Sequence, residues 1–432
     1  MIFFKNILTW LLRQEAKSVL QKYKPKVVAI TGSVGKTSTK DAIAAVVGAR
    51  YSMRASLKSY NSEIGLPLTI LGVENAWRNP LAWAANLIDG LSLMFTQVKY
   101  PEWLVLEVGA DRPGDISSLV PWLKTNVVVI TRLPEVPVHV EFFSSVEEVV
   151  EEKAALIDTL QPGGTLLLYA DDPRTAALAR RLPAPDATIT MFGFGAHAEV
   201  RGEQFEMITD SSDKPVGMRG TIVYAGGMVP VEIIGALGAH AFLPAVAAVG
   251  VGHALGLTTQ EIAEGVAHYQ PAPGRMRVLP GLKDTVVIDD TYNSSPAAVE
   301  AALETLAEVK MPGRKIAVFA DMLELGRTSV AEHRKIGERA SKVADLLVTV
   351  GFRARDIAEA ALDNGLKDEQ ILQYEDSRKA GEELKNIIQA GDCILVKGSQ
   401  SMRMERVVEE LMLEPQNAPD LLVRQDAEWK KR

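Results

Sequence analysis

The chain has 432 residues, more than the ~250–300 at which a single hydrophobic core stops growing, so we expect at least two domains. Hydrophobic residues make up 47% of it and charged residues 24%, a balance that excludes a disordered or fibrous protein. The net charge of −8 argues against a nucleic-acid partner, and the single cysteine, Cys393, excludes an intramolecular disulfide. We therefore expect a monomeric, cytoplasmic protein.

Residues 1–25 form the first predicted element, an amphipathic helix. Two interpretations stay open: the helix packs on its own domain, or it makes peripheral contact with the inner membrane surface. A transmembrane helix is not expected, because Lys5 and Asp89 interrupt the best apolar stretches. The apolar side chains that recur at helical spacing are Phe3, Phe4, Ile7, Leu8, Leu11, Leu12, Val19, Leu20 and Tyr23.

Residues 26–270 have the pattern of a central α/β domain with a mainly parallel sheet. Residues 186–235 differ, because short alternating strands and turns there predict an antiparallel patch added to that sheet. A helix at about 240–255 should close the domain. The runs that predict parallel strands, separated by helical patterns, are 27–31, 104–108, 127–131 and 165–170.

Two prolines and a glycine at 270–274 predict a linker, after which residues 271–414 form a second, Rossmann-like α/β domain. The polar tail at 415–432 contains Pro415 and Pro419, and we expect it to fray. The strands predicted for the second domain are 286–290, 315–320, 345–350, 371–375 and 393–397.

The segment after the first predicted strand resembles a phosphate-binding loop (P loop), which makes the central domain one of the P-loop ATPase type. It follows a strand and starts a helix, as such a loop requires, but it is two residues shorter than the common form. Its backbone N–H groups would hold ATP phosphates, Lys36 would reach the β- and γ-phosphates, and Thr37 would bind Mg²⁺. An ordinary glycine-rich turn would not explain Lys36 and Thr37 together at a helix start. The predicted nucleotide-binding residues here are Gly32, Ser33, Val34, Gly35, Lys36, Thr37 and Ser38.

Glu107 is the second predicted Mg²⁺ ligand. It ends an otherwise apolar strand, where an unpaired carboxylate would be costly without a cation. A lysine or arginine partner is the alternative explanation.

Taken together, the P loop and several further segments resemble the Mur ligases, which join amino acids or peptides to a UDP-muramoyl cell-wall precursor. They follow the family's order from about residue 25 to 410, and they look most similar to the branch that adds D-alanyl-D-alanine. The segments are 59–70, 106–116, 139–157, 274–281, 288–296, 320–326 and 395–405.

The resemblance implies an ATP-dependent ligase with two partners, a carboxylate-bearing peptide precursor as acceptor and an amine donor. ATP phosphorylates the carboxylate, the amine attacks the acyl phosphate, and an amide forms. A folylpolyglutamate-type ligase acting on another carboxylate stays open as an alternative. A non-catalytic ATP-binding subunit is a third possibility.

The resemblance also assigns further residues. His139 corresponds to a residue near a second Mg²⁺, and Lys153 to a lysine that becomes a carbamate supporting the metals. Arg275 would contact the phosphates. Asp290 would contact the ribose, with Tyr292 and Asn293 beside the nucleotide. The substrate residues would be Asn61, Asp321, Glu324, Lys397 and Ser399, although ordinary loop capping explains the last four almost equally well.

The sequence departs from the family at its start, because only 1–25 precede the first strand and the family's UDP-binding domain is not found there. The segment from Trp77 to Phe95 is apolar instead. Arg132 stands where asparagine is usual, and Ala241 follows His240 where an asparagine commonly touches adenine. These departures leave the acceptor open.

Overall fold

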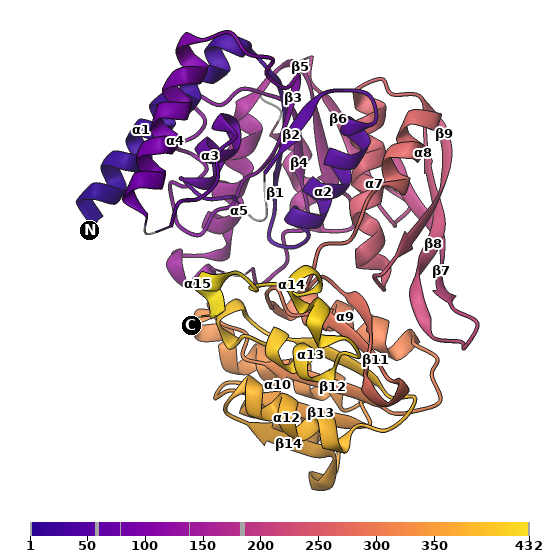
Figure 1. Ribbon diagram of the computed structural model, residues 1–432. Helices are drawn as coiled ribbons and strands as arrows, with labels where there is room; N and C mark the ends of the chain where they lie inside the picture. Colours follow the sequence, from indigo (N-terminus) through magenta and orange to yellow (C-terminus); the bar gives the residue numbers. More distant parts are fainter. Residues whose placement is uncertain (1, 57–59, 78, 138, 182–185, 431–432) are drawn as a thin grey trace.

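The computed structural model describes residues 2–56, 60–77, 79–137, 139–181 and 186–430, with the side chains of 2–4 and 427 excepted. Two α/β units lie one above the other, the first with a nine-stranded sheet and the second with a six-stranded sheet (Figure 1). The predicted α/β fold class with a mainly parallel sheet, an antiparallel patch and a second α/β domain is therefore confirmed. The predicted linker at 270–274 lies between the last helix of the first unit and the first strand of the second.

The first sheet has the strand order β2-β3-β1-β4-β5-β6-β7-β8-β9. Neighbouring strands are parallel from β2 to β7, and β7, β8 and β9 form the antiparallel patch. The strands are β1 (Lys26–Thr31), β2 (Met53–Ala55), β3 (Trp103–Glu107), β4 (Thr125–Ile130), β5 (Leu160–Tyr169), β6 (Thr188–Gly193), β7 (Val200–Thr209), β8 (Pro215–Tyr224) and β9 (Gly227–Ile234).

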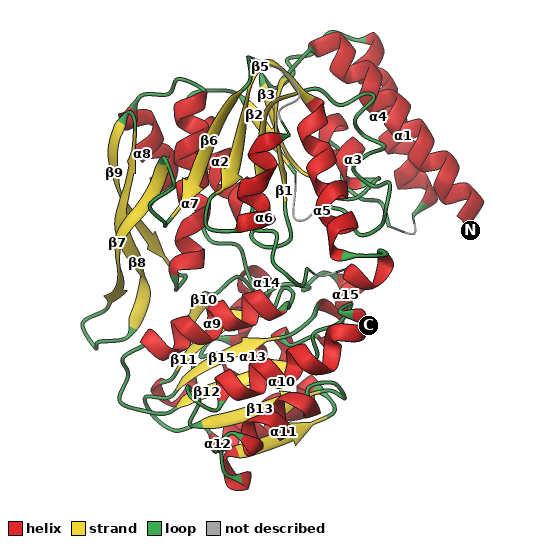
Figure 2. Cartoon of the chain, turned by 180° about the vertical axis from the view of Figure 1, so that it is seen from behind, coloured by secondary structure: helices red, strands yellow, loops and turns green. Residues whose placement is uncertain are grey.

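Helices cover both faces of this sheet, because alternate residues of its central strands are apolar on each side. Val28 and Ile30 of β1 face α2, α7 and α8, whereas Val27 and Ala29 face α1, α3 and α4. Figure 2 shows the two helical layers from behind. The helices are α1 (Ile2–Tyr23), α2 (Lys36–Gly48), α3 (Gly65–Leu71), α4 (Pro80–Phe95), α5 (Val146–Ala154), α6 (Pro173–Ala177), α7 (Ala239–Ala254) and α8 (Thr259–Ala267).

The second sheet has the order β10-β11-β15-β12-β13-β14, with only β10 antiparallel to its neighbour. Its strands are β10 (Arg277–Pro280), β11 (Val286–Asp290), β12 (Lys315–Ala320), β13 (Leu346–Val350), β14 (Ile371–Tyr374) and β15 (Cys393–Lys397). Its helices are α9 (Pro296–Glu308), α10 (Ser329–Ala340), α11 (Arg355–Asp363), α12 (Ser377–Ile387), α13 (Glu405–Leu411), α14 (Ala418–Leu421) and α15 (Ala427–Lys430).

Helix α1 packs on its own domain, the first of the two interpretations of the N-terminal segment. Its buried side chains Leu8, Leu12, Ala16 and Val19 join the core beneath the sheet. The predicted apolar residues Phe3 and Phe4 fall outside the described side chains. The described chain holds no helix with both the length and the hydropathy that crossing a membrane requires.

The expectation of a frayed C-terminal tail is wrong. Leu422 and Arg424 are buried, and the Arg424 guanidinium donates to Glu405 Oε2 at 2.8 and 3.0 Å. The same guanidinium donates to the main-chain oxygens of Thr291 and Tyr292. The tail is therefore folded back onto the segment after β11, because its arginine satisfies a buried carboxylate and two buried carbonyls.

Candidate active site

The loop between β1 and α2 is held in shape by the end of β4. Gly32 has φ +141°, and a Cβ there would come within 2.0 Å of Thr131 Oγ1, so only glycine fits. The Thr131 hydroxyl donates to Val34 O at 2.8 Å, and Ser33 N donates to Arg132 O at 2.9 Å. The loop is thus fixed where its backbone N–H groups meet the N-terminus of α2, a favourable place for an anion.

Lys36 begins α2 and bends back over the loop, with its Nζ donating to Gly32 O at 2.9 Å. Burial lowers its pKa, and the Arg275 guanidinium lowers it further, while the Glu107 carboxylate raises it. Lys36 and Arg275 are therefore neighbouring cations near the carboxylates of Glu107 and Asp111, and an added polyanion would relieve the repulsion between the two cations.

Glu107 ends β3 and is only 1% exposed. Its Oε1 accepts a hydrogen bond from Asn61 Nδ2 at 3.1 Å. Its Oε2 is buried and has no hydrogen-bond partner within the described part of the chain. A buried carboxylate oxygen without a donor is costly, so this atom is available to a cation.

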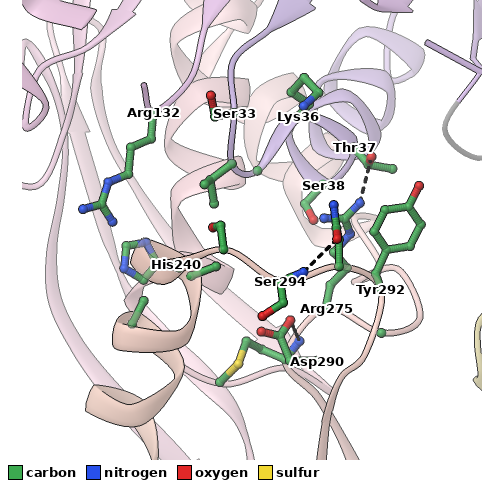
Figure 3. A pocket seen from close by; sticks show the side chains of 18 of the residues that line it. Ser33, Lys36, Thr37, Ser38, Arg132, His240, Arg275, Asp290, Tyr292 and Ser294 are labelled. Atoms are coloured by element: carbon green, nitrogen blue, oxygen red, sulfur yellow. Dashed lines mark hydrogen bonds between the residues drawn. The ribbon is translucent and has the colours of Figure 1, made fainter. Parts of the chain in front are cut away.

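These groups open into a pocket of about 340 Å³ between the two units. Its walls come from the P loop, from the ends of β3 and β4, from the start of α7, and from the segment that joins β11 to α9. Figure 3 shows P-loop side chains on one side and those of the second unit on the other. Predicted site residues that line it are Ser33, Val34, Gly35, Lys36, Thr37, Ser38, Asn61, Glu107, His139, Arg275, Asp290, Tyr292, Asn293 and Lys397.

Arg275 connects the two units across this pocket. One guanidinium nitrogen donates to Thr37 Oγ1 at 3.0 Å, and the guanidinium lies 4.0 Å from the ring centroid of Tyr292 (Figure 3). Asp290 is held on both oxygens, because Met276 N donates to Oδ1 at 3.2 Å and Lys397 Nζ donates to Oδ2 at 2.6 Å. The second unit therefore presents an ordered cation and an ordered carboxylate to the P loop.

Lys153 and His139 lie on neighbouring elements, each close to the same pocket wall. Lys153 is 1% exposed, and its Nζ donates to Ala110 O at 3.5 Å. Burial, and after it the nearby Lys36 ammonium, lowers the pKa of Lys153 to about 7. The ring nitrogens of His139 lie 2.6 Å from Glu324 and 3.4 Å from Asp111. The second unit thus contributes Glu324 beside His139.

Asp321 and Ser399 do not line the pocket. Asp321 Oδ1 accepts from Ala354 N at 2.8 Å, and Ser399 Oγ accepts from Leu323 N at 2.8 Å. Both side chains hold loops of the second unit, as the loop-capping alternative expects, and their role in donor binding stays a prediction.

The sequence did not indicate a role for Arg132 or His240, which lie side by side on one side of the pocket (Figure 3). Burial, with a contribution from Arg132, lowers the pKa of His240 to about 4, so its ring is neutral at pH 7. Gly238, with φ +88°, directly precedes α7. This glycine is the sequence feature that could have indicated a ligand-binding helix start at His240.

Within the described residues, no group of three or more His, Cys, Asp or Glu side chains is placed to hold a metal ion. A metal bound by Glu107 would therefore need further ligands, such as the Thr37 hydroxyl, a modified side chain or ligand oxygens.

Family models match most of the chain. The Mur ligase middle domain matches residues 30–252, and the glutamate ligase domain of the Mur ligases matches residues 274–400. The chain belongs to the Mur ligase family. It is accordingly an ATP-dependent ligase that forms amide bonds.

Named relatives of this Mur ligase agree with that assignment. The UDP-N-acetylmuramoyl-tripeptide–D-alanyl-D-alanine ligase of Bacillus subtilis is 29% identical over 94% of this chain and 79% of its own length. The structure of MurF ligase from Thermotoga maritima in complex with ADP is 26% identical, with a TM-score of 0.74, and covers 93% of this chain and 83% of that one.

A structure of Mycobacterium tuberculosis folylpolyglutamate synthase shares the fold, with a TM-score of 0.65 at 16% identity. It covers 93% of this Mur ligase and 96% of that chain.

Proposed function

We propose that this Mur ligase adds D-alanyl-D-alanine, or a similar amine donor, to the carboxylate of a cell-wall peptide precursor. The observation that carries the proposal is the pocket in which the P loop, Glu107 and Arg275 face one another between two Mur ligase domains. The Bacillus subtilis relative named above as a D-alanyl-D-alanine ligase supports the choice of donor.

The reaction would begin with transfer of the γ-phosphoryl group from ATP to the acceptor carboxylate. Lys36 and the N-terminus of α2 would hold the phosphates, and Arg275 would approach the same phosphates from the second unit. Their positive charge stabilises a phosphoryl group in transfer without covalent chemistry by the protein. The donor nitrogen would then attack the acyl carbon, phosphate would leave with its electron pair, and the nitrogen would lose a proton.

Thr37 and Glu107 would hold one Mg²⁺, and the unpartnered Glu107 Oε2 supports that assignment. The ion would neutralise charge on the phosphate oxygens. For a second ion, His139 and a carbamate on Lys153 are the proposed ligands. Carbamate formation needs a neutral amine, and a pKa of about 7 leaves a large fraction of Lys153 neutral near pH 7.

The nucleoside would lie toward the second unit and α7. Asp290, ordered by Lys397 and Met276, would accept from ribose hydroxyls, and Tyr292 would keep Arg275 in place. His240 and Arg132 would border the base. Because the reaction consumes ATP, the proposal places the enzyme in the cytoplasm.

The test is product formation from ATP, D-alanyl-D-alanine and UDP-muramoyl-tripeptide, followed by phosphate release and mass spectrometry of the amide. Matched reactions use L-alanine, glutamate or D-alanine as donor. We expect the dipeptide donor to give the highest turnover. Intact ATP binding with no amide from any muramoyl peptide would refute the proposal, and turnover on a folate acceptor would favour the folylpolyglutamate-type alternative.

A further inference from the structure

Helix α4 is apolar on two faces, and only one of them is buried. Trp83, 7% exposed, and Gly90 lie against the core. The outward face carries Leu81 at 80% exposed, Ile88 at 65%, Leu91 at 44% and Phe95 at 81%. Ala84 and Ala85 complete a continuous row at helical spacing, and Asp89 is the one charged residue of the helix.

The sequence carries the signals that start a regular helix at this position. Pro80 occupies the first turn, and the Asn79 side chain accepts hydrogen bonds from Leu81 N and Ala82 N at 3.1 and 3.2 Å. A capped helix whose outer face is apolar exposes a surface that water disfavours, which marks an interaction site.

Helix α1 lies parallel to α4 and fixes its far end. The Lys22 ammonium donates to Leu93 O at 2.9 Å and also to Thr96 O, and the Tyr23 hydroxyl lies 3.0 Å from both carbonyls. The two helices stand side by side at the edge of the first unit (Figure 1). Ile7 at 43% and Trp10 at 59% exposed add apolar area on α1.

The charge of α1 and the residues just after it indicates which kind of partner would bind this surface. The segment 1–26 contains six basic residues and one acidic residue, Glu15, which is buried, although the whole chain has a net charge of −8. The basic residues on α1 are Lys5, which forms an ion pair with Glu63, and Arg13, Lys17 and Lys22; Lys24 and Lys26 follow the helix. A local excess of positive charge beside an exposed apolar helix matches the anionic headgroups and acyl boundary of a lipid bilayer.

We infer that the outer face of α4, together with the basic flank of α1, docks the protein on the surface of an anionic bilayer. Helix α4 has 16 residues, about 24 Å at 1.5 Å per residue, so it lies in the interface rather than crossing it. Most of the apolar side of α1 is packed in the core, so the main apolar contact belongs to α4, with the exposed Ile7 and Trp10 of α1 beside it. This inference goes beyond the proposed ligase function and does not depend on it.

The experiment is vesicle co-sedimentation of the full chain with phosphatidylcholine alone and with phosphatidylcholine mixed with phosphatidylglycerol. We expect binding to the mixed vesicles, weakened by salt. The variant Leu81→Ser/Ile88→Ser/Phe95→Ser should bind roughly tenfold or more weakly. Arg13→Gln/Lys17→Gln should lose the preference for phosphatidylglycerol.

The matched control replaces exposed apolar residues elsewhere, Val330→Ser/Phe352→Ser/Leu413→Ser, and should bind as the parent does. Thermal unfolding of each variant, measured without vesicles, establishes that it is folded. Equal sedimentation of the parent and the α4 variant overturns the inference. A parent protein that binds neither kind of vesicle also overturns it. If that parent forms dimers in sedimentation velocity and the α4 variant is monomeric, a second copy of the chain covers the face instead.

Discussion

At the scale of single residues, the site combines local patterns with contacts between distant segments. The P loop was predictable because strand, glycines, Lys36 and helix start follow one another within a few residues. The position of Arg132 near His240 was not predictable, because the two residues come from different elements that only the folded sheet brings together. Asp321 and Ser399 lie outside the pocket lining, because a position at a strand end does not fix where the side chain points.

Lys153 gives the first prediction. Lys153→Met should abolish turnover, since no carbamate can form, yet raise the free energy of unfolding by about 1–3 kcal/mol because a buried amine is removed. The pKa of Lys153 is lower in the folded chain than its ordinary 10.5, so the folded state binds fewer protons between pH 7 and 10.5. The free energy of unfolding of the parent therefore rises with pH between 7 and 10.5. The difference in this free energy between Lys153→Met and the parent should become smaller over the same range.

Urea unfolding at pH 6.5, 7.5 and 9 checks this narrowing, with the exposed exchange Lys124→Met as control. Labelling with ¹³C-bicarbonate followed by NMR detects the carbamate carbon directly. Parent-like turnover of Lys153→Met would remove this residue from the site.

At the scale of elements, hydrophobic periodicity predicted most helices and strands, but it missed elements whose stability depends on buried polar groups. The tail was expected to fray because it is polar and contains prolines. In the structure Arg424 reaches Glu405, which is 0% exposed, across 19 positions of sequence. A charged pair buried in this way leaves no periodic pattern to detect.

The second prediction concerns that pair. Arg424→Ala should lower the free energy of unfolding by about 3–5 kcal/mol, because it leaves the Glu405 carboxylate buried with one of its two arginine partners removed. It should also weaken ATP binding, since Arg424 holds the carbonyls of Thr291 and Tyr292. Urea unfolding and calorimetric titration with ATP measure the two effects. An exchange at the exposed Arg355 is the control, and an unchanged midpoint for Arg424→Ala would mean that the tail does not brace this loop.

Glu15 gives the third prediction, at the contact between α1 and α4. Burial raises its pKa to about 7, and its Oε2 has no hydrogen-bond partner in the described structure. The folded state therefore binds more protons than the unfolded state between pH 4.5 and 7, and the stability from the neutral acid is lost as pH rises through 7. At pH 8, Glu15→Gln should have a free energy of unfolding about 1–3 kcal/mol higher than the parent, measured by urea unfolding. The difference between the two proteins should close toward pH 5. A gap that is constant with pH would assign the effect to shape rather than charge.

At the scale of the whole molecule, one pocket is built by two sheets. The order of domains followed from the sequence, because linker and strand patterns are local. The contact of Arg275 with Thr37 could not be predicted from those patterns, since it depends on how the two units approach each other.

Arg275 gives the fourth prediction. Arg275→Gln should reduce kcat by roughly a hundredfold, because its charge meets the phosphates from the opposite unit, while ATP affinity falls less. Steady-state phosphate release and calorimetric titration with ATP separate the two quantities. The surface exchange Arg334→Gln should change neither. A variant whose ATP affinity falls while its kcat stays unchanged would show that Arg275 binds ATP in the ground state only.

The burial of Cys393 allows a direct test of whether the two units move relative to each other. It is the only cysteine in the sequence, it is 0% exposed, and burial raises its thiol pKa to about 12. Maleimide dyes react with thiolates, so the native thiol stays unlabelled at neutral pH. Two cysteines introduced at the exposed positions Gln97 and Phe352, one on each unit, would take up a donor and acceptor pair without any background substitution. Single-molecule energy transfer could then follow opening and closing as ATP and the peptide partners bind.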